Sequence, residues 1–193
     1  MGDEANEEDV ALMALVARGD EVAFARLVEK HQQAVLGTVA KMTHHSADTE
    51  DIAQQVFLRL WKSARRYQPT AKFTTFLFTI TRNLVFNATR RKSRRKEHSL
   101  DQQEDGWQHL AEDPNTSARP DETLVQNELR EVVDRAIASL PEKQRLAVIL
   151  RRYEQMPYEE IAKVLGLSVS AVKSQLFRAR AALREALEPY LAD

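Results

Sequence analysis

The aromatic and basic side chains between residues 72 and 96 are suited to binding a single strand of nucleic acid. Bases stack on aromatic rings while arginine contacts phosphate, and each stacked base contributes about 1–3 kcal/mol. This chemistry is noncovalent recognition. The residues that suggest it are Thr75, Thr79 and Arg82 opposite the apolar stripe of a predicted helix, Phe78 and Phe86 beside them, and six basic residues within 90–96. Two alternatives stay open: the phenylalanines belong to the core, or the basic run is a solvated tail.

A second segment able to bind DNA lies at residues 156–180. Pro157 suits a first helical position, Gly166 can adopt the left-handed conformation that ends a helix, and Ser168 can cap the next one. The pattern predicts a helix–turn–helix whose second helix has a polar and basic outer face, which fits a major groove. That face consists of Ser168, Ser170, Lys173, Ser174, Phe177, Arg178 and Arg180. A helical hairpin with a solvated charged face is the alternative.

A third surface is predicted on the helix at residues 48–66, where an acid, an amide, a leucine and a tryptophan share one face. Its members are Asp51, Gln54, Leu58, Trp61 and Arg65, spaced so that they align along a helix. Such a mixture is typical of protein-binding surfaces. Alternatively, Leu58 and Trp61 are simply buried.

The overall charge hides a strong local segregation. The 193-residue chain has a formal net charge of −1, yet residues 3–9 and 101–122 are acidic and 90–96 are basic. There is no cysteine, which excludes disulfides and thiolate metal sites. No apolar run reaches the roughly 20 residues that span a bilayer, and the acidic start lacks a secretion signal. A cytoplasmic location is therefore expected.

The elements that position these residues are all predicted to be helices. Apolar periodicity and few glycines or prolines indicate an all-α protein of two small helical domains joined by a flexible acidic linker. The predicted boundaries are 1–98 for the first domain, 99–122 for the linker and 123–193 for the second domain. Four or so helices are expected in the first domain and four in the second.

These motifs together resemble those of bacterial sigma factors of the extracytoplasmic-function class, in the sigma-70 family. GDEVAF at 19–24 resembles the opening of sigma region 2, and DTEDIAQQVFLRLW at 48–61 resembles its polymerase-binding helix. KFTTFLFTITRN at 72–83 resembles the promoter-melting segment, and 140–184 resembles sigma region 4 with its helix–turn–helix. The four matches occur in the order and spacing of the family.

The resemblance implies a non-enzymatic factor that binds core RNA polymerase and directs promoter-specific transcription initiation. It implies promoter DNA and core RNA polymerase as partners, allows an anti-sigma factor, and implies no cofactor or metal. Polymerase docking is expected at Asp51, Gln54, Gln55, Leu58 and Trp61. Recognition of the −10 element as a melted strand, with a flipped base held by the loop before the helix, is expected at Lys72, Phe73, Thr75, Phe78, Arg82, Asn83, Phe86, Arg90, Arg91 and Arg94. Recognition of the −35 element as duplex is expected at the outer face of the helix–turn–helix.

Three other functions are compatible with parts of this pattern. A two-domain regulator with a ligand-sensing first domain would bind duplex DNA without polymerase. A metal-dependent hydrolase could use His31, His44, His45, Asp48 and Asp51, although the adjacent histidines diverge on a helix. A non-enzymatic adaptor could bind acidic protein segments through the basic run.

Overall fold

The computed structural model describes residues 2–44, 46–98 and 120–191, and within these ranges the chain is helical, as predicted. The elements are α1 (Gly2–Val16), α2 (Glu21–Thr43), α3 (Thr49–Ser63), the short 3-10 helix η1 (Ala64–Arg66), α4 (Phe73–His98), α5 (Pro120–Ser139), α6 (Glu142–Arg152), α7 (Tyr158–Leu165) and α8 (Val169–Leu191). Most of the predicted linker, 99–119, lies outside the described residues. Helix α5 begins at Pro120 rather than at 123, a position that proline suits because its missing N–H would have no partner there.

Helices α1 to α4 form the N-terminal bundle. Their apolar stripes face one another, so that Leu27, Leu60 and Leu77 are completely buried. The Asp20 carboxylate caps α2 by accepting a hydrogen bond from the Ala23 amide at 2.9 Å, which satisfies one of the amides left free at a helix start. The connection between α1 and α2 is therefore a turn that ends in a capped helix start.

Helices α5 to α8 form the C-terminal domain, and α7 with α8 make the predicted helix–turn–helix. Gly166 ends α7 in the left-handed conformation with φ of 64°, and the Ser168 hydroxyl accepts a hydrogen bond from the Ala171 amide at 3.2 Å. One detail differs from the prediction. Pro157 has an extended backbone and precedes the helix as its N-cap, so the first helical residue is Tyr158.

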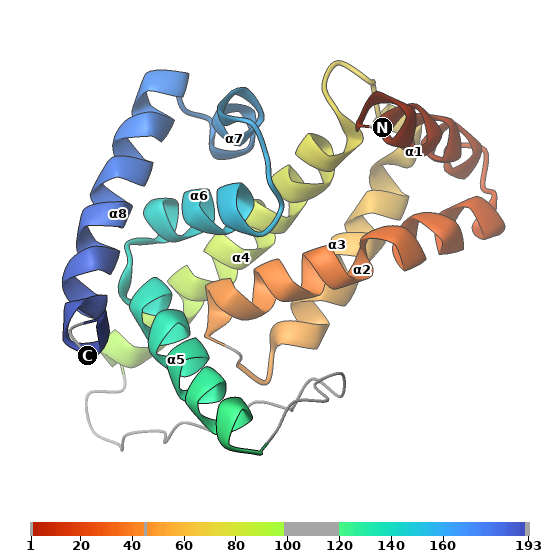
Figure 1. Cartoon of the computed structure of the whole chain (residues 1–193). Coiled ribbons are helices and arrows are strands. Elements are labelled where there is room, and N and C mark those ends of the chain that lie inside the picture. The colour runs from red at the N-terminus through yellow and green to blue at the C-terminus, as the bar shows by residue number, and fades with distance from the viewer. Residues whose placement is uncertain (1, 45, 99–119, 192–193) are drawn as a thin grey trace.

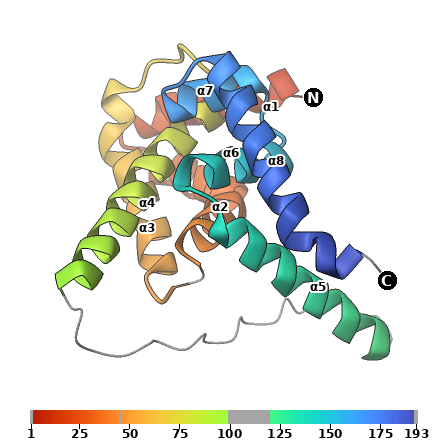
Figure 2. The same ribbon diagram turned by 90° about the vertical axis from the view of Figure 1, so that its left-hand side faces the viewer.

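The two domains pack directly against each other. In Figure 1, α4 crosses the middle of the molecule diagonally, with α1 to α3 on one side and α6 to α8 on the other. Helix α4 contacts α7, and α2 contacts α5 and α6, as the turned view in Figure 2 also shows. Buried apolar residues of both domains belong to one continuous cluster. The sequence predicted two domains but gave no indication of this contact.

Arg145 of α6 makes hydrogen bonds across the interface between the domains. It is 7% exposed and donates hydrogen bonds to the carbonyl oxygens of Met42, Ala138 and Leu140. One of its nitrogens lies 2.9 Å from Nε2 of His44, which accepts, because a guanidinium group has no acceptor. Burial lowers the pKa of Arg145, an effect that the nearby Glu142 charge opposes. The side chain therefore joins the end of α2 to the turn before α6.

We expect Arg145→Ala to lower the free energy of unfolding by about 2–3 kcal/mol, because buried carbonyl oxygens lose a charged donor. Urea denaturation followed by circular dichroism measures the change. Lys143→Ala is the matched control, since Lys143 is exposed on the same helix and should change stability by less than about 0.5 kcal/mol. Equal losses in the two variants would contradict the structural role of Arg145.

Candidate nucleic-acid and polymerase interfaces

Helix α4 divides the predicted strand-binding residues into buried and accessible groups. Phe73, Thr75 and Phe78 are buried, so neither phenylalanine can stack on a base in this arrangement. Lys72, Arg82 and Phe86 are partly buried. The exposed members are Asn83, Arg90, Arg91 and Arg94. The alternative that Phe78 is a core residue therefore holds for this arrangement.

A small cavity opens beside the loop that precedes α4. It has a volume of about 320 Å³ and is lined by loop residues 67, 68, 70 and 71, by Thr75, Phe76 and Thr79 of α4, and by Lys163 of α7. The loop supplies polar groups and the tyrosine ring a flat face, a combination that suits an unstacked base. The sequence did not indicate that Lys163 would line this cavity, because α7 reaches the cavity only through the packing of the two domains.

Helix α7 lies against this part of α4. The Glu160 carboxylate accepts a hydrogen bond from the Thr75 hydroxyl at 3.3 Å and pairs with the Lys72 ammonium group at 3.3 Å. Burial lowers the pKa of Arg82, whose guanidinium group lies close to Gly166. Glu160 of the second domain thus contacts two residues, Lys72 and Thr75, that were expected to bind a nucleic-acid strand.

The outer face of α8 is free of the domain contact. Ser170, Lys173, Ser174 and Arg178 are exposed, as is Arg180. Phe177 is 76% exposed, an unusual state for a large apolar side chain. Ser168 is exposed as well, although its hydroxyl is engaged as the helix cap. A protruding polar and basic helix of this kind can enter a major groove.

Helix α3 presents the third predicted surface. Asp51, Gln54 and Gln55 are exposed, and Leu58 is 56% exposed. Trp61 is partly buried, and its ring packs edge-on against Phe24 with centroids 5.0 Å apart. The alternative that Leu58 is buried is wrong, whereas Trp61 contributes both to the bundle and to the surface.

Two of the three histidines named for a metal site have other contacts, and His45 lies outside the described residues. His31 binds Asp9 and His44 contacts Arg145. Among the residues that the structure describes, no cluster of three or more His, Cys, Asp or Glu side chains could hold a metal ion. Across the same ranges, no helix is both long and apolar enough to cross a membrane.

Comparison with known proteins connects both domains to one family. Residues 27–95 match the family model described as Sigma-70 region 2, and 130–183 match Sigma-70, region 4. The chain is 32% identical over 191 residues to the RNA polymerase sigma-H factor of Pseudomonas aeruginosa, with 97% of each covered. It is 31% identical over 184 residues to the ECF RNA polymerase sigma-E factor of Escherichia coli K12, covering 95% of this chain and 96% of the relative.

Solved structures show the same architecture. CnrH, solved in complex with the cytosolic domain of CnrY, matches with a TM-score of 0.70 at 26% identity, covering 94% of this chain and 98% of that one. The sigma factor RpoE of Bartonella quintana, solved with the anti-sigma factor NepR, matches with a TM-score of 0.68 at 23% identity, covering 86% and 96%. The second likeness supports the fold alone.

A helix–turn–helix domain joined to an aromatic and basic helical bundle defines a sigma factor, a non-enzymatic protein that directs promoter-specific transcription initiation. The chain belongs to the sigma-70 family, with close likeness to its extracytoplasmic-function members. Sigma factors of this kind bind core RNA polymerase and promoter DNA. The rival functions of hydrolase, ligand-sensing regulator and adaptor do not explain both family matches.

We expect Glu160→Lys to loosen the contact between the domains by about 1 kcal/mol, because an attraction to Lys72 becomes a repulsion between partly exposed groups. The chain has no cysteine, so dyes on cysteines introduced at exposed Glu29 and Ser174 can report the domain separation by energy transfer. Transfer should fall in Glu160→Lys. Glu159→Lys makes the same charge change at an exposed neighbour and should leave transfer unchanged. An equal fall in both variants would show a general charge effect instead.

Proposed function

We propose that α8 recognises the −35 promoter element as duplex DNA, that α4 and its preceding loop hold the −10 element as a melted strand, and that α3 docks on core RNA polymerase. The observation that carries the proposal is the location of three differently built surfaces on separate helices of a sigma factor. An exposed basic helix, a loop-bordered cavity and a mixed polar and apolar face suit three different contacts.

The duplex contact is supported by the exposure of α8. Its polar face carries three cations, Lys173, Arg178 and Arg180, beside the exposed ring of Phe177. Arginine can pair with the edge of guanine through two hydrogen bonds, and an apolar ring can contact a thymine methyl group. The face therefore holds the side-chain types that distinguish base pairs in a major groove.

The single-strand contact is supported by the cavity beside residues 67–71 and by the cations along α4. Extrusion of a base from a duplex costs a few kcal/mol, which contacts in a fitted pocket can offset. Lys72 and Arg82 lie near the cavity end of the helix, while Arg90, Arg91 and Arg94 follow further along. Phosphates along a strand would meet these charges in order.

The strand-binding surface requires the two domains to separate. Glu160 and Lys163 of α7 lie where the strand would bind, so α7 must leave α4 before DNA can reach it. We infer that polymerase binding selects the separated form, with segment 99–122 as the tether. Docking of α3 would favour this form only if polymerase binds it more tightly than the packed one.

We also propose an anti-sigma factor as a partner and a cytoplasmic site of action. Of two solved structures of similar fold, the sigma factor RpoE is bound to the anti-sigma factor NepR, and CnrH is bound to the cytosolic domain of CnrY. A partner of this class would control how much of the chain is available to polymerase.

The polymerase contact is tested by a pull-down with purified cognate core RNA polymerase. The wild-type chain should bind and should support transcription from a library of promoter sequences. Asp51→Ala should weaken polymerase binding about fivefold to tenfold, since it removes an exposed charge from the docking face without touching the core. Its thermal stability and its binding to selected −35 duplex should stay unchanged. Failure of the wild-type chain to bind polymerase would refute the proposed function.

Arg178→Ala tests the duplex contact. With holoenzyme on the promoter sequences selected above, binding should fall by about 1–3 kcal/mol if the guanidinium group pairs with one guanine. The loss should shrink when that base pair is already mutated. Arg184→Ala, a substitution near the far end of the same helix, provides the control for general charge loss. An equal loss on every sequence would assign Arg178 to a phosphate instead.

A further inference from the structure

The loop beside the proposed base-binding cavity is anchored at both ends by α1 and α2. The loop runs between Tyr67, just after η1, and Phe73, the first residue of α4. Residues 67, 68, 70 and 71 line the cavity, so the position of the loop sets the shape of the cavity. The anchoring side chains are far away from the loop in sequence.

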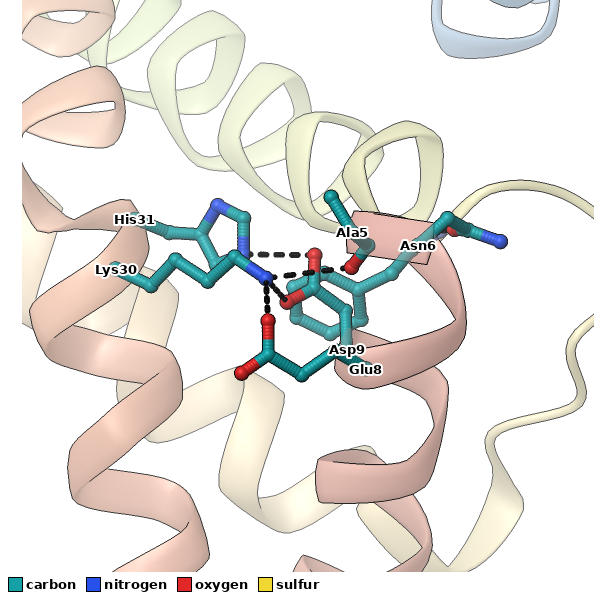
Figure 3. Close-up of polar contacts among 7 residues, drawn as sticks. Ala5, Asn6, Glu8, Asp9, Lys30 and His31 are labelled. Atoms are coloured by element: carbon teal, nitrogen blue, oxygen red, sulfur yellow. Dashed lines mark hydrogen bonds and ion pairs between the residues drawn. The ribbon is translucent and has the colours of Figure 1, made fainter. Parts of the chain in front are cut away.

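A polar cluster fixes the first turns of α1 on α2. Lys30 pairs with both Glu8 and Asp9 at 2.7 Å and donates to the carbonyl oxygen of Ala5 at 3.2 Å. Nε2 of His31 lies 3.0 Å from the Asp9 carboxylate. Figure 3 shows the lysine and histidine converging on the start of α1. These contacts hold residues 5 to 9 against α2.

The electrostatics of Asp9 agree with this geometry. Burial by itself would raise the pKa of the Asp9 carboxyl, but hydrogen bonds from His31 and Lys30, together with their charges, hold it below its usual value. The ionised carboxylate is thus stabilised in the bundle. It binds both of its neighbours on α2 at once.

Asn6, within this fixed segment, caps α4 from another helix. Its Oδ1 accepts a hydrogen bond from the Phe73 amide at 2.8 Å. A helix start leaves amides without intrahelical partners, and a side-chain oxygen normally supplied by the preceding residue satisfies one of them. Here that preceding residue is Lys72, whose side chain has only donors. Asn6 provides the missing acceptor.

Contacts between aromatic rings also hold the two ends of the loop. The completely buried Phe73 ring lies 5.2 Å from the His31 ring and 6.3 Å from the Tyr67 ring. Burial raises the pKa of Tyr67, and the nearby Asp9 charge raises it further. Phe73 therefore contacts the α1–α2 cluster directly through His31, and Tyr67 packs on Phe73, so both ends of the loop are held.

We propose that Asn6 is a positioning residue for −10 recognition: by capping Phe73 it holds the loop 67–73 in the shape that accepts an extruded base. The proposal rests on the proposed function, because it assigns a task to the same cavity. Asn6 itself does not contact the strand. It acts through the first turn of α4, and this contact lies within the N-terminal bundle, so it persists when the domains separate.

The test uses holoenzyme and fluorescent single-stranded oligonucleotides with the selected −10 sequence, either intact or with one abasic site. The abasic position is the one at which the wild-type holoenzyme loses most affinity. Asn6→Ala should lower affinity for the intact strand about fivefold, the effect of one lost capping acceptor. Its affinity for the abasic strand should change by less than twofold. The preference for the intact strand should therefore shrink about fivefold.

Two further variants separate positioning from general stability. Asn6→Asp keeps an acceptor and favours a helix start, so the preference for the intact strand should return. Glu7→Ala removes an exposed neighbour on the same helix and should leave the preference unchanged. Thermal unfolding and polymerase binding are measured for each variant, and affinities are compared at equal holoenzyme concentration.

The outcomes distinguish the two proposals. A wild-type holoenzyme with no preference for the intact strand at any abasic position would refute the proposed base capture. A wild-type preference that Asn6→Ala retains in full would overturn only the role of Asn6. An equal loss by Asn6→Ala on intact and abasic strands would also overturn it, since a merely structural residue would act that way.

Discussion

Helix α4 has to bury side chains on one face and present polar groups on another, and most of the structure follows from this constraint. Leu77 and Leu84 pack into the N-terminal bundle, which fixes the rotation of the helix. The same rotation directs Lys72, Thr75 and Arg82 toward α7. A helix that is buried along one side and charged along the other can serve as core element and binding surface together.

In the packed form, α7 already engages groups on α4 that we propose for strand binding. Glu160 satisfies Lys72 and Thr75, and Phe78 lines a cavity with Met156 and Pro157. The Glu160 carboxylate carries a negative charge, as a phosphate of nucleic acid would, and this is the one feature that the two kinds of contact share. The domain separation that we propose would cost the free energy of these contacts and of the Arg145 hydrogen bonds, which binding to polymerase and promoter would have to supply.

The loop before α4, which we propose as a recognition surface, is supported by residues from distant parts of the chain. The residue directly before the helix is Lys72, whose side chain has no acceptor for the amide of Phe73. The cap comes from Asn6, which is 67 positions away on α1. Helix α1 is in turn held on α2 by the salt bridge between Asp9 and Lys30. Precise binding loops need such support because loops have few internal contacts.

The sequence by itself determined the helical class, the two domains, the helix–turn–helix and the family. Apolar periodicity and capping residues such as Gly166 and Ser168 act locally, so the sequence contains their effect in full. An exposed polar and basic face was also expected on α8, whereas for Leu58 on α3 both burial and exposure were compatible with the pattern. For Phe78 both burial and exposure were compatible with the pattern, since a single ring beside a core stripe belongs to either face.

Only the tertiary structure decided the contacts between distant residues. No pattern near Lys72 indicates Glu160, none near Phe73 indicates Asn6, and none near Met42 indicates Arg145. Each of these pairs is one donor and one acceptor brought together by the packing of whole helices. The free energy of that packing is summed over many apolar contacts, so the position of any single polar partner appears only after the chain has folded.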